Sequence, residues 1–191
     1  MKDHGHHDPT AAAHERRALE LLIIRCQLGE RDALDQLVVD WHPSVFRYVA
    51  SFVHEPREID EIGQNVWLGV LRGLPRLKER ASFAPWLFGI ARRSAFDWMR
   101  QRYRRAPEEP WPERAEVADV SDEVGAEDEG FDPNLFARGL ASLAPLEREV
   151  VLLHYFESLP IEKIGEAIGA PPGTVKSRLH RARRKLRTSF E

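Results

Sequence analysis

The sequence predicts an all-α fold made of two small helical domains joined by a flexible acidic linker. Apolar residues recur at spacings of three and four residues in both halves of the chain, which is the period of an amphipathic helix. No stretch shows the convincing two-residue alternation of a strand. Between the halves, residues 106–132 hold eleven acidic residues against one basic residue and lack the helical period. Such a segment cannot bury enough apolar surface to fold.

Four helices are expected before the linker. The first ends at Gly29, and the second runs over about residues 34–52 with a candidate kink at Pro43. Pro56 can open the third helix, because proline is well suited to a first helical position. The fourth helix is expected over about residues 82–104.

The third helix is expected to display a polar patch. Its apolar stripe consists of Ile59, Ile62, Val66, Val70 and Leu74. Polar residues that lie largely off this stripe are Asp60, Glu61, Gln64 and Asn65. The patch therefore points to a contact surface rather than to the core.

The C-terminal domain has the pattern of a helix-turn-helix. Ile161, Ile164 and Ile168 form the stripe of a short helix, and Gly169 can adopt the positive φ that ends it. A second helix follows the prolines at 171 and 172, with an apolar stripe made of Val175, Leu179, Ala182 and Leu186. Its opposite face carries Ser177, His180, Arg181 and Arg184, flanked by Lys176 and Arg187, with Thr174 near the helix start. Arginine and lysine in this setting can contact guanine edges and phosphates in the major groove.

Charge is distributed unevenly over a chain whose formal net charge is -3. Residues 92–105 hold six arginines against Asp97, and residues 171–191 hold seven Lys or Arg against Glu191. Two basic blocks of this kind are typical of two contact sites on a polyanion such as DNA. The acidic residues of the linker offset the positive charge of the two basic blocks. As a flexible chain, the linker would place its ends on the order of 30 Å apart. Two interpretations of the linker stay open, a solubilising spacer and a DNA-mimicking segment that shields the basic helices.

The N-terminal tail and the single cysteine do not indicate a metal site. His4, His6 and His7 lie in a polar tail, residues 1–14, that we expect to be disordered. Cys26 has no partner thiol and is expected to be a small buried hydrophobe. We find no phosphate-binding loop and no nucleophile with a base, so we expect neither cofactor nor enzymatic activity. Without a signal core or a membrane-spanning run, we expect a cytoplasmic protein with no membrane insertion.

Four runs of the sequence carry a resemblance to a known protein family. They are GTVKSRLHRARRKL at 173–186, LAPLEREVVLLHYFESLPIEKIGEAIG at 143–169, IDEIGQNVWLGVLRGL at 59–74 and FAPWLFGIARRSAFDWMRQRYRR at 83–105. All four resemble the extracytoplasmic-function class of bacterial sigma factors, in the sigma-70 family of RNA polymerase subunits. The first two resemble the fourth conserved region of that class, and the other two resemble the second.

The resemblance implies that the chain binds core RNA polymerase and directs promoter-specific transcription initiation. Residues 15–105 would form region 2 and residues 133–191 would form region 4. Implied partners are promoter DNA, the coiled coil of the largest polymerase subunit, the flap of the second-largest subunit and, as a further candidate, an anti-sigma factor. Polymerase binding would fall to Asp60, Glu61, Gln64 and Asn65. The minus-ten element would be held by Leu77, Lys78, Ser82, Arg92, Arg93 and Arg100. The minus-thirty-five element would be read by His154, Thr174, Lys176, Ser177, Arg178, His180, Arg181 and Arg184.

Some positions differ from the usual residues of the family. Arg93, Leu77 and Glu79 are such positions beside the minus-ten site, so the base preference there is left open. Asn65 replaces a frequent glutamate in the polymerase-binding helix, and we expect binding to survive this change.

Two other functions compete with this interpretation. A free-standing helix-turn-helix regulator would explain the C-terminal half, but it leaves the match over residues 59–105 unexplained. A metal-dependent nucleic-acid enzyme would use carboxylates such as Asp60 and Glu61 to hold a divalent cation, and it predicts metal-dependent cleavage. Of these two, the free-standing regulator would bind its operator without polymerase.

Overall fold

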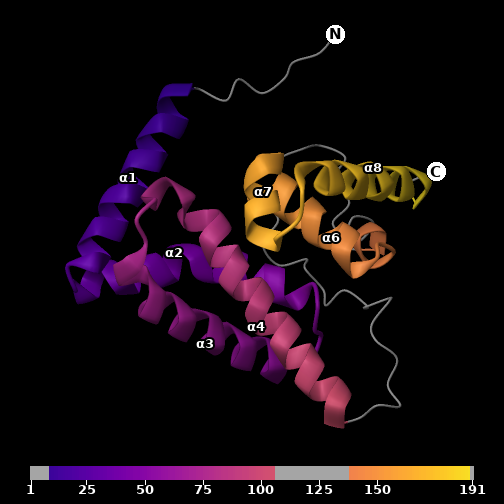
Figure 1. Cartoon of the computed structure of the whole chain (residues 1–191), viewed down its shortest axis with the longest axis horizontal. Coiled ribbons are helices and arrows are strands. Elements are labelled where there is room, and N and C mark those ends of the chain that lie inside the picture. The colour runs from indigo at the N-terminus through magenta and orange to yellow at the C-terminus, as the bar shows by residue number, and fades with distance from the viewer. Residues whose placement is uncertain (1–8, 106–137, 190–191) are drawn as a thin grey trace.

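The computed structural model describes residues 9–105 and 138–189, which form helices and turns only, as the all-α prediction requires (Figure 1). The N-terminal half consists of α1 (Pro9–Gln27), α2 (Arg31–Ala50), α3 (Pro56–Gly73), the 3-10 turns η1 (Leu74–Arg76) and η2 (Arg80–Ser82), and α4 (Phe83–Arg105). The C-terminal half consists of α6 (Pro145–Val151), the π-helical turn η3 (Leu152–Phe156), α7 (Ile161–Ile168) and α8 (Pro172–Ser189). The linker and the tail histidines lie outside the described residues.

Local sequence signals explain most helix boundaries of the N-terminal half. Gly29 adopts a φ of 84° between α1 and α2, and Pro56 occupies the first turn of α3. The second helix runs through Pro43 without interruption. At the N-terminus the structure differs from our expectation, because α1 begins at Pro9 whereas we predicted disorder up to residue 14. Three consecutive alanines, residues 11–13, favour helix strongly enough to account for this extension.

The predicted helix-turn-helix is formed by α7 and α8. Gly169 ends α7 with a φ of 66°, a left-handed conformation that glycine adopts without strain. Gly165 is required for a different reason, because a Cβ there would lie 2.7 Å from the carbonyl oxygen of Ala170 in the turn. Val175, Leu179 and Ala182 are buried on the inner face of α8, which fixes the opposite face toward solvent.

The two halves of the chain pack against each other. Helix α4 lies between them and contacts α3 on one side and α7 on the other (Figure 1). Phe88 in α4 and Ile164 in α7 are both fully buried and belong to one continuous cluster of core residues. Among the described residues, the two predicted helical domains therefore share one continuous core. None of the described helices is both long and apolar enough to cross a membrane.

A buried arginine ties the C-terminal half together and to the N-terminal half. The Arg148 guanidinium is fully buried and donates hydrogen bonds to backbone carbonyl oxygens of Leu140, Ala141 and Leu143. It also donates to the carbonyl oxygen of Ser51, just after α2, at 2.7 Å. Burial lowers the pKa of Arg148 to about 10, so the group stays charged at neutral pH.

Replacing Arg148 by methionine should lower the free energy of unfolding by about 3 kcal/mol, because four backbone carbonyl oxygens would lose hydrogen bonds from a charged donor. Urea unfolding followed by circular dichroism measures this change. The matched control is Arg57→Met on the exposed first turn of α3, which should change the free energy by less than about 0.5 kcal/mol. Equal stability of the two variants would contradict the structural role assigned to Arg148.

Candidate nucleic-acid interface

The outer face of α8 presents the predicted recognition residues to solvent. Exposed side chains on this helix include Lys176, Ser177, His180, Arg181 and Arg184. They lie opposite the buried stripe that holds α8 on the rest of the domain. The outer face is therefore rigidly positioned and strongly cationic, as a helix that enters the major groove must be.

The remaining predicted minus-thirty-five residues are less accessible. Thr174 and Arg178 are half-buried at the edge of α8. His154 lies on the preceding helix, where its Nδ1 is 3.2 Å from the carbonyl oxygen of Leu159. This contact ties the ring to the loop before α7.

A groove of about 730 Å³ separates the start of α8 from the N-terminal half. Its apolar walls include Phe52, Phe96 and Met99. Its polar edge is formed by Thr174, Ser177, Arg178 and Arg181, so it brings together half of the residues predicted to read the minus-thirty-five element.

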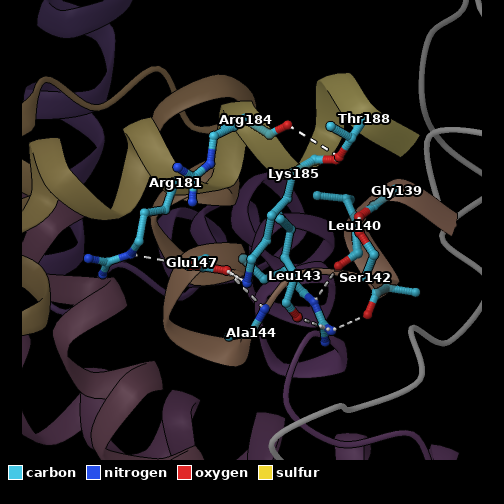
Figure 2. A network of polar contacts seen from close by, with 12 residues as sticks. Gly139, Leu140, Ser142, Leu143, Ala144, Glu147, Arg181, Arg184, Lys185 and Thr188 are labelled. Carbon is cyan, nitrogen blue, oxygen red and sulfur yellow. Dashed lines mark hydrogen bonds and ion pairs between the residues drawn. The ribbon is translucent and has the colours of Figure 1, made fainter. Parts of the chain in front are cut away.

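The Glu147 carboxylate at the start of α6 forms ion pairs with two basic side chains of α8. Its carboxylate lies 2.7 Å from Lys185 Nζ and 3.4 Å from Arg181 Nε (Figure 2). It also accepts a hydrogen bond from the backbone N–H of Ala144, which satisfies one donor at the helix start. Burial alone would raise the pKa of Glu147, but the bonds from Lys185 and Ala144 outweigh it and the pKa is lowered. Glu147 is therefore ionised at neutral pH.

The predicted minus-ten residues lie on the loop before α4 and along α4. Lys78, Arg93 and Arg100 are exposed, and Leu77 and Ser82 are half-buried. The loop is held by Gln27 of α1, whose Nε2 donates to the carbonyl oxygens of Leu74 and Leu77, each at 2.9 Å. Gln27 is a positioning residue that the sequence analysis missed.

Arg92, the sixth predicted minus-ten residue, is engaged by a buried carboxylate of the C-terminal half. The Glu149 side chain is 0% exposed, and its Oε1 accepts hydrogen bonds from Arg92 Nε at 3.0 Å and from the Tyr48 hydroxyl at 2.6 Å. Burial raises the pKa of Glu149 although the positive charges of Arg92 and Arg178 oppose the shift. Burial and the neighbouring Glu149 also raise the pKa of Tyr48, so its hydroxyl remains a donor.

The polar patch predicted on the third helix is present on α3. Asp60, Glu61, Gln64 and Asn65 are all exposed, while the apolar stripe beneath them is buried. A small apolar notch of about 140 Å³, lined by Phe46 and Trp67 among others, adjoins Asp60 and Gln64. The four polar side chains thus form an exposed patch above a buried apolar stripe.

Each half of the chain matches a known protein family. The Sigma-70 region 2 family matches residues 37–105, and the Sigma-70, region 4 family matches residues 134–186. RNA polymerase sigma factor CarQ from Myxococcus xanthus is 31% identical over 163 residues, which covers 83% of this chain and 90% of CarQ. The ECF RNA polymerase sigma factor ShbA from Streptomyces griseus is 28% identical over 191 residues, which covers 93% of this chain and 97% of ShbA.

A solved structure shares the fold. The sigma factor RpoE from Bartonella quintana, in complex with the anti-sigma factor NepR, superposes with a TM-score of 0.66 at 20% identity. The match covers 82% of this chain and 95% of RpoE. With its two family matches and its relatives, the chain belongs to the extracytoplasmic-function sigma factors of the sigma-70 family, which direct RNA polymerase to promoters.

Proposed function

We propose that this sigma factor divides promoter recognition between its two halves. Helix α8 reads the minus-thirty-five element, and α4 with the loop before it holds the minus-ten element. The observation that carries the proposal is the two-faced character of α8, which buries Val175, Leu179 and Ala182 and exposes a row of cations. Such a helix, entered through the tight turn at Gly169, matches the geometry of major-groove readers.

On α8, individual side chains take different parts. Arg181 and Lys176 are long exposed cations that can donate to guanine O6 and N7. Ser177 and His180 have shorter reach and suit base edges or phosphates close to the helix. Arg184 is exposed one turn beyond Arg181 and is assigned to a phosphate, because base edges are contacted mainly by the N-terminal residues of a recognition helix.

At the minus-ten element the protein must hold separated strands. Unstacking bases costs a few kcal/mol, which cationic contacts to phosphates can offset. Arg93, Arg100 and Lys78 are exposed cations along α4 and the preceding loop. Because Gln27 fixes that loop through two backbone carbonyls, Lys78 is carried on a defined rather than a free segment.

Polymerase binding is assigned to the patch on α3. Its exposed acids, Asp60 and Glu61, and its amides, Gln64 and Asn65, complement a basic and polar helical surface. This surface is proposed to be the coiled coil of the largest subunit, with the flap of the second-largest subunit contacting the C-terminal half. Sigma factors are not an enzyme family, so Asp60 and Glu61 are assigned to docking rather than to metal-dependent catalysis.

An anti-sigma factor is a further proposed partner. The related RpoE was solved in complex with one. In this chain, the groove with Phe52, Phe96 and Met99 in its walls and Arg178 and Arg181 at its edge would suit an acidic amphipathic segment. Occupation of the groove would cover part of the recognition surface of α8.

Replacing Glu61 and Gln64 together by alanine should abolish promoter-specific transcripts, because the side chains proposed to contact polymerase would be lost. The assay is run-off transcription with purified core polymerase of the source organism on a pool of its genomic upstream fragments. Both side chains are exposed, so the free energy of unfolding should change by less than about 0.5 kcal/mol. Asp35→Ala, on an exposed position of α2, is the control and should leave transcripts intact. Undiminished transcription by the double variant at limiting concentration would exclude docking through α3.

Replacing Arg181 by alanine should reduce the free energy of promoter binding by about 1 to 3 kcal/mol and relax the base specificity at one promoter position. Replacing Arg184 by alanine should weaken binding to all promoter sequences alike. It should also reduce the slope of log affinity against log salt concentration by about one unit, because one phosphate contact is lost. Binding of the reconstituted holoenzyme to promoter variants over a salt series measures both effects. Equal, sequence-independent losses from the two variants would refute the assignment of Arg181 to a base.

A further inference from the structure

The segment that joins α3 to α4, residues 74–82, is bonded locally along its backbone. It consists of the 3-10 turns η1 and η2 with residues 77–79 between them, and it runs beside α1 (Figure 1). The N–H of Leu77 donates to the carbonyl oxygen of Leu74, and the N–H of Ser82 donates to that of Glu79. Each of these bonds closes one turn only. The direction of one turn relative to the other must therefore be set by other contacts.

The side chain of Gln27, the last residue of α1, bridges the two turns. Its Nε2 donates to the carbonyl oxygens of Leu74 and Leu77, each at 2.9 Å, and both belong to the end of η1. Its Oε1 accepts a hydrogen bond at 3.0 Å from Nε of Arg80, the first residue of η2. Carbonyl groups at a helix end lack partners within the helix, and the amide supplies them here.

The chemistry of this bridge is specific to an uncharged amide. A glutamine side chain carries two N–H donors and one carbonyl acceptor on adjacent atoms. At Gln27, both donors face backbone carbonyls and the acceptor faces an arginine. The opposite orientation of the amide would set oxygen against oxygen on one side and nitrogen against nitrogen on the other. The two turns are therefore joined by one side chain whose orientation is fixed from both ends.

The bridge is anchored in the core and leaves the tip of the segment exposed. Ile23 and Cys26, the residues of α1 just before Gln27, are buried, so the amide is carried on a well-packed helix. Between the bridged positions, Lys78 and Glu79 are exposed. Lys78 is therefore presented by a short stretch of chain that is held on both sides.

We propose that Gln27 is a positioning residue for the minus-ten element. Its amide sets the course of residues 77–79, so that α1 takes part in minus-ten recognition without touching the DNA. The inference rests on the proposed function, which assigns the loop before α4 to the minus-ten element, and it names the group that gives this loop its shape. Groups that select a ligand must be held to within about 0.5 Å by supporting hydrogen bonds. The bridge through Gln27 supplies that support.

The first test is Gln27→Met in the full chain, assembled with core polymerase. Methionine has a similar length and volume but removes all three hydrogen bonds of the bridge. Transcription from a wild-type promoter is compared with transcription from single-base variants of its minus-ten and minus-thirty-five elements. Discrimination against wrong minus-ten bases should fall about tenfold, because the loop is displaced. Discrimination at the minus-thirty-five element should stay at the wild-type level.

The matched control is Gln36→Met, the same change at an exposed position of α2. It should leave discrimination at both elements near wild type. Wild-type discrimination at the minus-ten element in Gln27→Met would overturn the proposal. Equal losses at the two elements, or the same minus-ten loss in Gln36→Met, would also overturn it, because neither pattern is explained by displacement of the loop.

A second variant tests the bridge from its other end. Arg80→Met removes only the bond to Gln27 Oε1 and should reduce minus-ten discrimination less than Gln27→Met does. The double variant should be no worse than Gln27→Met alone, since Arg80 is proposed to act through the amide. Additive losses would show that Arg80 acts on the promoter independently of Gln27, which contradicts the bridge.

Two further variants distinguish this inference from the proposed function. Lys78→Ala and Arg93→Ala remove exposed cations that the proposed function places on the minus-ten element. Loss of minus-ten discrimination in these two variants, with none in Gln27→Met, would refute the role of Gln27 and leave the proposed function intact. Wild-type behaviour of both cation variants would refute the proposed minus-ten surface, and the inference with it.

Discussion

The contact of α4 with the C-terminal half is the constraint on which the rest of the structure depends. Helix α4 is shared, since one face completes the core with α3 and the other packs on α7. Two charged groups of α6 are buried at this boundary: Arg148, which donates to Ser51 across it, and Glu149, which accepts from Tyr48 and Arg92. Buried charges require partners to offset lost hydration. The position of α6 relative to the N-terminal half is therefore specified by hydrogen bonds as well as by apolar packing.

This arrangement places two roles on the same side chains. Arg92, Arg178 and Arg181 have carboxylate neighbours within the protein, and they are also the cations proposed to contact DNA. Free in solution, the chain satisfies them internally, and the net charge of -3 weakens non-specific attraction to polyanions. The polar patch on α3 is different, because its four side chains stay exposed in the packed arrangement. The patch on α3 is therefore accessible without any change in how the halves pack.

Features set by local sequence were predicted correctly, and features set by distant partners were not. The two faces of α8 follow from three- and four-residue spacing, and the turns at Gly29 and Gly169 follow from the conformations that glycine tolerates. The exposure of the α3 patch was predicted in the same way. In contrast, Glu149 and Arg148 lie in a charged run that is normally exposed, and their burial depends on residues far away in the sequence, such as Tyr48 and Ser51. The role of Gln27 depends likewise on a loop beyond α3. The residue assignments on DNA and polymerase remain predictions.

The central claim is that the two halves of the free protein are packed together through α4. Fluorescence energy transfer between dyes on cysteines replacing Asp35 in α2 and Thr188 in α8 measures this directly. Both positions are exposed, while the native Cys26 is buried with a raised pKa and should label slowly. We predict high transfer in the folded free chain and a large decrease when the chain is unfolded in urea. The same transfer efficiency in both states would contradict the claim.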